Sequence, residues 1–165
     1  MLILGIDPGT SIVGWALVRY DGRNLSLIKS GTVTNPPRTG QPEKLIHIYK
    51  ETASLLQSEK PDCVALEKLF FFKNDKTAMS VAEARGVIVL TSALCRTTLY
   101  EYTPLEVKMA VTGYGRATKS QVQTMVKTIL GLPKPIASDD ANDAAAIAIT
   151  AAHHQKFYQK IKTSQ

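Results

Sequence analysis

Two short apolar runs in this chain each end at an acidic residue. Residues 2–6 read Leu-Ile-Leu-Gly-Ile and stop at Asp7, and residues 63–66 read Cys-Val-Ala-Leu and stop at Glu67. Apolar runs of about four to eight residues bounded by turn signals are typical of strands buried on both faces. If the two strands are neighbours in one sheet, both carboxylates lie at the same end of it. This feature predicts a fold built around a sheet, with acidic side chains at one end of its strands.

The order of the predicted elements indicates a mixed α/β fold. Three strand-like segments, 2–6, 12–19 and 25–34, follow each other with tight turns and predict an antiparallel meander. The later predicted elements alternate between helix and strand before ending in helices: 43–58, 63–67, 76–96, 98–103, a short helix opening at Pro104, 119–130 and a last helix from about Ser138. The first and fourth strands can pair in parallel through a right-handed crossover. We expect a five-stranded mixed sheet flanked by helices, in one domain over 1–165 with a polar, fraying tail at about 155–165.

Composition excludes several classes of protein. With 44% hydrophobic and 21% charged residues among 165, the chain is globular rather than mainly disordered. A net charge of +6 hints at a polyanionic partner such as nucleic acid. Cys63 and Cys95 have apolar neighbours and no zinc-site spacing, which indicates a reducing compartment. The chain has neither a signal peptide nor a stretch of roughly 18 apolar residues, so we expect a cytoplasmic protein without a membrane partner.

The last predicted helix adds two acids to the pair at the strand ends. Asp140 and Asp143 are three residues apart and share one helical face, and the apolar stretch 144–149 predicts a helix packed on the sheet. Several buried carboxylates repel each other, and divalent cations would remove that conflict. Carboxylate oxygens are ligands that Mg²⁺ and Mn²⁺ prefer. Two such cations can activate water and stabilise the leaving oxygen of a phosphodiester.

Each acid also has a plainer interpretation when it is taken alone. Asp7 could cap the turn that follows it, and Glu67 could be an ordinary strand-end charge. Asp139 and Asp140 could serve the positive end of the helix dipole, with Ser138 as the N-cap. The joint occurrence of the acids at the ends of buried elements favours the metal site.

Four motifs occur in a characteristic order along the chain: 5–10 (Gly-Ile-Asp-Pro-Gly-Thr), 65–67 (Ala-Leu-Glu), 113–122 (Gly-Tyr-Gly-Arg-Ala-Thr-Lys-Ser-Gln-Val) and 140–144 (Asp-Ala-Asn-Asp-Ala). In this order the chain resembles RuvC, a family of bacterial Holliday-junction resolvases with an RNase H-like fold, from Met1 to about His154. The resemblance implies a homodimeric, Mg²⁺-dependent endonuclease, with Mn²⁺ as a substitute, that acts in recombination and repair. It would nick two strands of like polarity symmetrically across a four-way junction, leaving 5′-phosphate and 3′-hydroxyl ends. Its implied partners are the RuvA and RuvB branch-migration proteins.

The resemblance also assigns four acids to metal binding and catalysis by motif position: Asp7, Glu67, Asp140 and Asp143. Asp139 adds an acid beside Asp140, so the choice between these two depends on alignment to Asp143. Asn142 and Ala145 depart from the family pattern, which affects the expected local packing but not the acids.

Basic residues are concentrated in 104–134, where five lysines and arginines face one acid, a net of +4. A solvated helix face would explain that charge, but the neighbouring glycines and the resemblance favour phosphate contacts. Lys108 and Lys119 match family positions near the scissile phosphate, where a lysine offsets charge in the transition state. Arg116 belongs to the same basic loop and is a candidate DNA contact.

Two apolar features also have a second interpretation. Phe70 opens a run of three phenylalanines after the fourth strand, in a segment predicted as a loop. Such residues are usually core, but Phe70 matches the family's aromatic that stacks on a base at the crossover. The predicted helix 76–96 is apolar on more than one side, which fits either core packing or the dimer interface that the resemblance implies.

Three rival functions share part of this pattern. The YqgF-type nucleases begin with a similar Asp-x-Gly strand, but the four ordered motifs and the 104–122 segment favour RuvC. Actin-like sugar kinases and ATPases use an Asp-x-Gly-Thr loop but need two such domains, and 165 residues hold one. A junction-binding module without turnover would be expected to lose at least one of the acids.

Overall fold

The computed structural model describes the backbone of residues 1–68 and 75–163 and the side chains of 1–68 and 78–154. The five strands are β1 (Leu2–Asp7), β2 (Ile12–Tyr20), β3 (Leu25–Thr34), β4 (Cys63–Glu67) and β5 (Thr98–Tyr102). The helices in the described residues are α1 (Gln41–Glu59), α2 (Asp75–Leu94), α3 (Pro104–Thr112), α4 (Lys119–Ile129) and α5 (Asp139–Thr163). The predicted elements are confirmed with ends that differ by at most two residues. α5 continues through 155–163, where a fraying tail was expected.

The strands form one mixed sheet in the order β3-β2-β1-β4-β5. The pairs β1–β2 and β2–β3 are antiparallel and make the predicted meander. β4 runs parallel to β1 through the crossover made by α1, and β5 runs parallel to β4. Ile6 pairs with Leu66, so the next residue on each strand, Asp7 or Glu67, lies at the same sheet edge. The parallel pairing inferred from the two apolar runs is confirmed.

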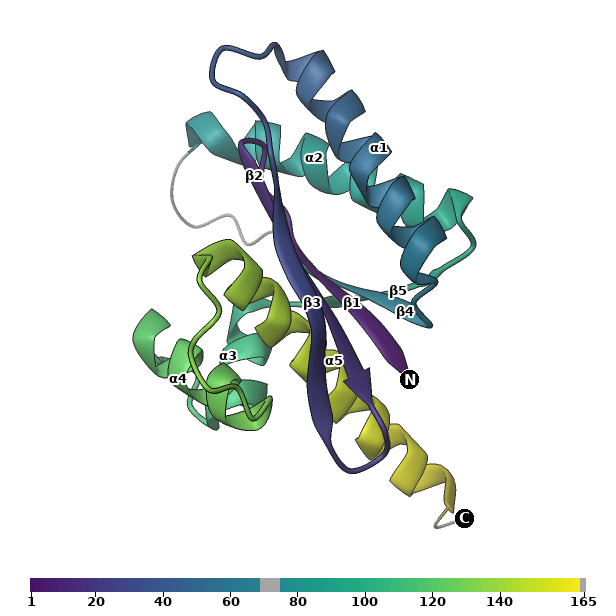
Figure 1. The fold of residues 1–165 in the computed structure, drawn as a ribbon, viewed down its shortest axis with the longest axis vertical. Helices are drawn as coiled ribbons and strands as arrows, with labels where there is room; N and C mark the ends of the chain where they lie inside the picture. Colours follow the sequence, from purple (N-terminus) through teal and green to yellow (C-terminus); the bar gives the residue numbers. More distant parts are fainter. Residues whose placement is uncertain (69–74, 164–165) are drawn as a thin grey trace.

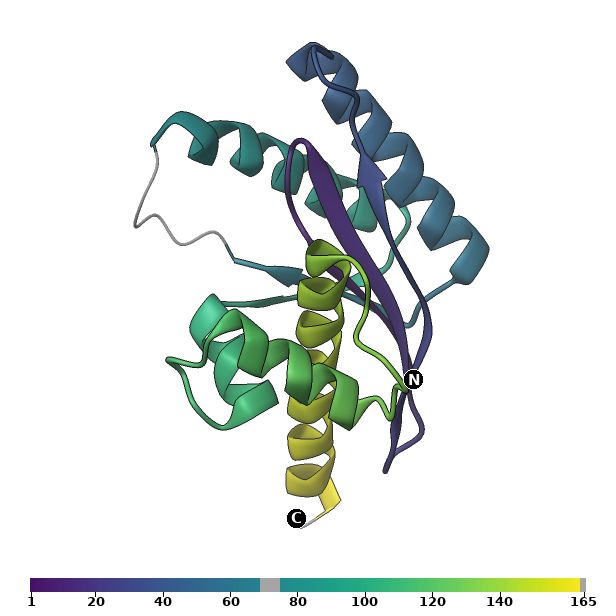
Figure 2. The same ribbon diagram turned by 60° about the vertical axis from the view of Figure 1, so that its left-hand side comes forward.

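Helices cover both faces of the sheet (Figures 1 and 2). α1 and α2 pack against each other on one face, and α5 lies on the other face against β1 and β2. α3 and α4 pack beside α5. The alternation of side chains along β1 divides the core in two: Ile3 faces α5, whereas Leu4 and Ile6 face α1 and α2.

Capping residues define where α3 and α4 begin. Thr103 accepts a hydrogen bond from the backbone N–H of Glu106, and the Glu106 carboxylate accepts one from the Thr103 N–H. Thr118 and Gln121 make the same reciprocal pair at the start of α4. These capping boxes set the first residues of α3 and α4 beside the end of β4. No helix in the described part of the chain is long and apolar enough to cross a bilayer.

Candidate active site

The strand-end acids both face α5. Ile3 on β1 and Ala65 on β4 belong to the core cluster that α5 covers. Side chains along a strand alternate between faces, so Asp7, four residues beyond Ile3, and Glu67, two beyond Ala65, point to the same side. The sheet therefore presents two carboxylates to the first turns of α5.

Two glycines let α5 approach the sheet at this point. A Cβ on Gly14 would lie 2.0 Å from the backbone oxygen of Asp140, and one on Gly5 would lie 2.1 Å from the backbone oxygen of Ala144. Any side chain at either position would displace the helix. Gly14 pairs with Asp7 across β1 and β2, so the first turn of α5 reaches the strand end that carries Asp7. Sequence reasoning missed Gly14, although a glycine inside an apolar strand signals a close backbone approach.

Burial and mutual repulsion perturb these acids. The pKa of Asp7 is raised to about 7, chiefly by burial and also by the charges of Glu67, Asp143 and Asp140, with Lys119 acting in the opposite direction. The pKa of Glu67 is also raised to about 7, chiefly by burial and then by Asp143, with Lys108 acting in the opposite direction. The pKa of Asp143 is raised by burial, against the opposing charge of Lys119. The acids predicted from sequence thus lie within electrostatic range of one another.

The donor set fits a hard divalent cation by its chemistry. In the parts of the chain that the structure describes, no three His, Cys, Asp or Glu side chains already form a group able to hold a metal ion. The raised pKa values of Asp7 and Glu67 nevertheless show that ionising these buried carboxylates is costly. Carboxylate oxygens are the ligands that Mg²⁺ and Mn²⁺ prefer, whereas zinc sites mostly use sulfur and nitrogen ligands.

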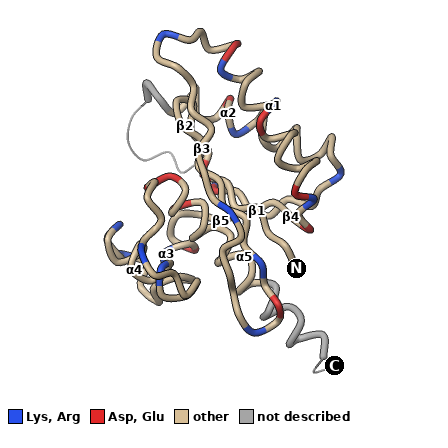
Figure 3. Tube along the Cα trace, viewed as in Figure 1, with Lys and Arg blue, Asp and Glu red and all other residues tan. Residues whose placement is uncertain are grey.

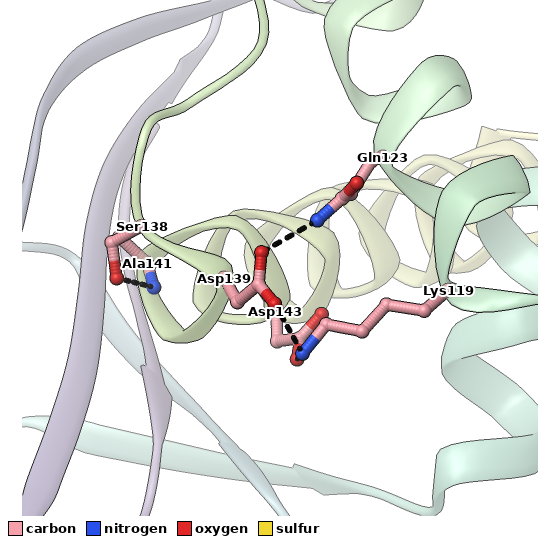
Figure 4. A network of polar contacts seen from close by, with 6 residues as sticks. All are labelled: Lys119, Gln123, Ser138, Asp139, Ala141 and Asp143. Atoms are coloured by element: carbon pink, nitrogen blue, oxygen red, sulfur yellow. Dashed lines mark hydrogen bonds and ion pairs between the residues drawn. The ribbon is translucent and has the colours of Figure 1, made fainter.

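Both predicted lysines lie at this site. A pocket of ≈ 260 Å³ is lined by residues from β4, α3, α4 and α5: Glu67, Pro104, Val107, Lys108, Lys119, Val122, Asp143, Ala146 and Ile147. The Lys119 Nζ lies 3.3 Å from an oxygen of Asp143 and 3.3 Å from an oxygen of Asp139 (Figure 4). Further lysines and arginines lie along α3, α4 and the turns around them (Figure 3). The pocket thus combines carboxylates with cationic groups.

The remaining predicted site residues have different outcomes. Arg116 is exposed in the loop between α3 and α4, and it is not among the described residues that line the pocket. Phe70 lies outside the described residues. Asp139, whose role the sequence left open, contacts Lys119 directly. No sequence signal indicated that contact, because it joins two helices.

Comparisons with known proteins agree with this geometry. The family model for "Crossover junction endodeoxyribonuclease RuvC" matches residues 3–151. A protein of that name from Pelotomaculum thermopropionicum is 46% identical over 98% of this chain and 99% of its own length. The Thermus thermophilus RuvC structure matches with a TM-score of 0.89 and 30% identity, covering 96% of this chain and 97% of that one. The same protein in complex with a Holliday junction substrate matches with a TM-score of 0.90, 31% identity and 96% of each chain. These matches and the five-stranded mixed sheet confirm the expected α/β fold of RNase H-like type.

Proposed function

This chain belongs to the RuvC family of crossover junction endodeoxyribonucleases, and from that premise we propose that it resolves four-way DNA junctions by hydrolysing one phosphodiester bond in each of two strands. The observation that carries the proposal is a pocket that brings one strand-end acid, Glu67, and one helix acid, Asp143, together with the two lysines. Asp7 and Asp140 lie within electrostatic range of these acids. In recombination and repair, symmetric nicks with 5′-phosphate and 3′-hydroxyl ends would leave two duplexes that can be ligated.

Family membership implies dependence on a divalent metal ion, and we propose Mg²⁺, with Mn²⁺ as a substitute. The residues that would hold it are the four acids at the sheet edge and the start of α5: Asp7, Glu67, Asp140 and Asp143. When bound, such cations supply the positive charge that activates water and stabilises the leaving 3′ oxygen. The acids contribute position, because the strand ends and the close packing of α5 restrict where their oxygens can lie.

The two lysines contribute positive charge beside the acids. Lys108 lies close enough to Glu67 to lower its pKa, and Lys119 lies between acids of α5. Either ammonium can stabilise a phosphate oxygen as charge develops in the transition state. We assign Arg116 to a DNA contact outside the pocket, and Phe70 to stacking on a base at the crossover.

A homodimer would suit a two-fold symmetric junction. α2 packs on α1 by one side, yet it exposes Met79, Leu90 and Leu94, which are 73%, 57% and 63% accessible. Helix faces this apolar are the type that a second copy covers. We assign α2 to the dimer interface, RuvA and RuvB to the partners that deliver the junction, and the bacterial cytoplasm to the place of action.

A cleavage assay tests the function. The protein is incubated with mobile and with fixed four-way junctions, with and without Mg²⁺, and the nicks are mapped on all four strands. Paired symmetric nicks that need Mg²⁺ support the proposal. Nicking of other nucleic acids in preference to junctions would favour a YqgF-type activity, and tight junction binding without nicks would favour a non-catalytic module.

A further inference from the structure

The Asp139 carboxylate contacts two side chains of α4, those of Gln123 and Lys119. Its Oδ1 accepts a 2.8 Å hydrogen bond from the Gln123 Nε2, and its Oδ2 lies 3.3 Å from the Lys119 Nζ (Figure 4). Asp139 is the first residue of α5, and the four acids assigned to the cation do not include it. Its two oxygens are therefore both engaged by α4, not by the strand ends.

The position of Lys119 explains why such a contact is needed. Lys119 is the first residue of α4, where the helix dipole repels a cation, and the first turn of α4 contains no acid. The compensating charge has to come from another element, and α5 supplies it through Asp139 and Asp143. The two acids raise the pKa of Lys119 above its usual value despite the opposing effect of partial burial.

The two acids differ in what else they do. Asp143 is half-buried, contributes to the raised pKa values of Asp7 and Glu67, and is an assigned cation ligand. A divalent cation held by the Asp143 oxygens would compete with Lys119 for their negative charge. Asp139 accepts a hydrogen bond from Gln123 of α4, so its contact with Lys119 does not depend on the oxygens that a cation would take.

We propose that Asp139 is a positioning residue that holds Lys119 at the scissile phosphate while Asp143 serves the cation, with Gln123 fixing the Asp139 carboxylate. The inference rests on the proposed function. It makes Asp139 neither an additional cation ligand nor only a helix-end charge, which were the open interpretations of this residue.

A double-mutant cycle on the full-length protein tests it. Asp139→Asn, Lys119→Ala and the double variant are compared in single-turnover cleavage of a four-way junction at saturating Mg²⁺. Asp139→Asn should slow cleavage about fivefold or more, because a loosened ammonium loses alignment. In the Lys119→Ala background it should have no further effect. Asp139→Glu should restore part of the rate, and Gln123→Leu should slow it less than Asp139→Asn.

Two measurements without cleavage separate the alternatives. Mg²⁺ binding by calorimetry should change less than about threefold in Asp139→Asn, whereas loss of a true ligand or of its support costs about 10- to 100-fold. The NMR signal of the Lys119 side-chain ammonium, recorded with Mg²⁺ and without DNA, should shift in Asp139→Asn. Thr124→Ala is the control, because Thr124 is an exposed residue of α4 whose hydroxyl donates to the Ser120 backbone oxygen. It should leave both the Mg²⁺ affinity and the ammonium signal unchanged.

The outcomes distinguish this inference from the function on which it rests. A wild-type rate for Asp139→Asn, or an effect that persists in full without Lys119, would overturn the positioning role. A tenfold or greater loss of Mg²⁺ affinity would make Asp139 a ligand instead. If the wild-type protein cuts no junction, the proposed function fails, and the ammonium signal still decides whether Asp139 holds Lys119.

Discussion

Gly14→Ala should disable the site without removing any polar group. The new Cβ would lie 2.0 Å from the backbone oxygen of Asp140 and 2.9 Å from the Asp140 Cβ. Ordinary van der Waals contact begins at 3.4 Å, so the first turn of α5 has to retreat by about 1.4 Å. The clash is between the sheet and the backbone of α5, so no flexible side chain can move aside to relieve it.

The expected cost divides between stability and activity. Overpacking of this kind lowers the free energy of unfolding by about 1–3 kcal/mol, which urea titration followed by circular dichroism measures. A displacement of about 1 Å at reacting groups costs on the order of 100-fold in rate. We therefore expect a folded variant with single-turnover cleavage reduced by about that factor and with weaker Mg²⁺ binding.

Two further glycine variants test the reasoning. Gly5→Ala meets the Ala144 backbone oxygen at 2.1 Å and should act in the same direction. Gly86→Ala, on the exposed face of α2, meets no atom of this chain within 4 Å. Measured at a protein concentration too low for copies to associate, it should leave stability unchanged or raise it by up to about 1 kcal/mol. Wild-type cleavage and Mg²⁺ binding in Gly14→Ala would refute the claim that close packing of α5 sets the position of its acids.

Three more predictions concern charge at the site. Asp7→Asn should bind junctions in a gel-shift assay but should not cut them with Mg²⁺, and full cleavage would contradict the metal hypothesis. At pH 8 and without metal, the same variant should raise the free energy of unfolding by up to about 4 kcal/mol, because it removes a charge that burial opposes. The pKa values of Asp7 and Glu67 are raised to about 7, so the stability that their neutral forms contribute is complete below about pH 4 and is lost as pH rises through 7. Thermal unfolding of the metal-free protein should show that loss, and Mg²⁺ should restore more stability at pH 8 than at pH 5; a flat profile would contradict it. Lys119→Ala should lose more single-turnover rate than junction affinity, and an unchanged rate would count against its assignment.

The elements with strong local signals were predictable from sequence. The apolar run of β1 and the Pro-Asp break before β4 indicated both strands, and the parallel pairing followed from the crossover. The acids at the strand ends were recognisable because charge there interrupts an otherwise apolar pattern. Local propensity and periodicity carry this information without any tertiary contact.

What escaped prediction depends on contacts between distant segments. The role of Gly14 depends on where α5 begins its path across β2, and the Asp139–Lys119 contact depends on how α4 packs beside α5. Asn142 is fully buried with neither side-chain polar atom partnered, a cost that no pattern in the sequence reveals. Phe70 remains a prediction outside the described residues.

The path of the chain has a consequence for its biosynthesis. The proposed cation ligands come from β1 (Asp7), β4 (Glu67) and α5 (Asp140 and Asp143), so the site assembles only when α5 packs on the sheet. Contacts between segments so far apart in sequence form slowly, because a long loop must close before they are gained. A nascent chain that still lacks α5 has no Asp140 or Asp143, and its central sheet cannot complete the acid set. If these acids act as proposed, cutting activity requires a chain that includes α5, and proteolytic removal of α5 would end it.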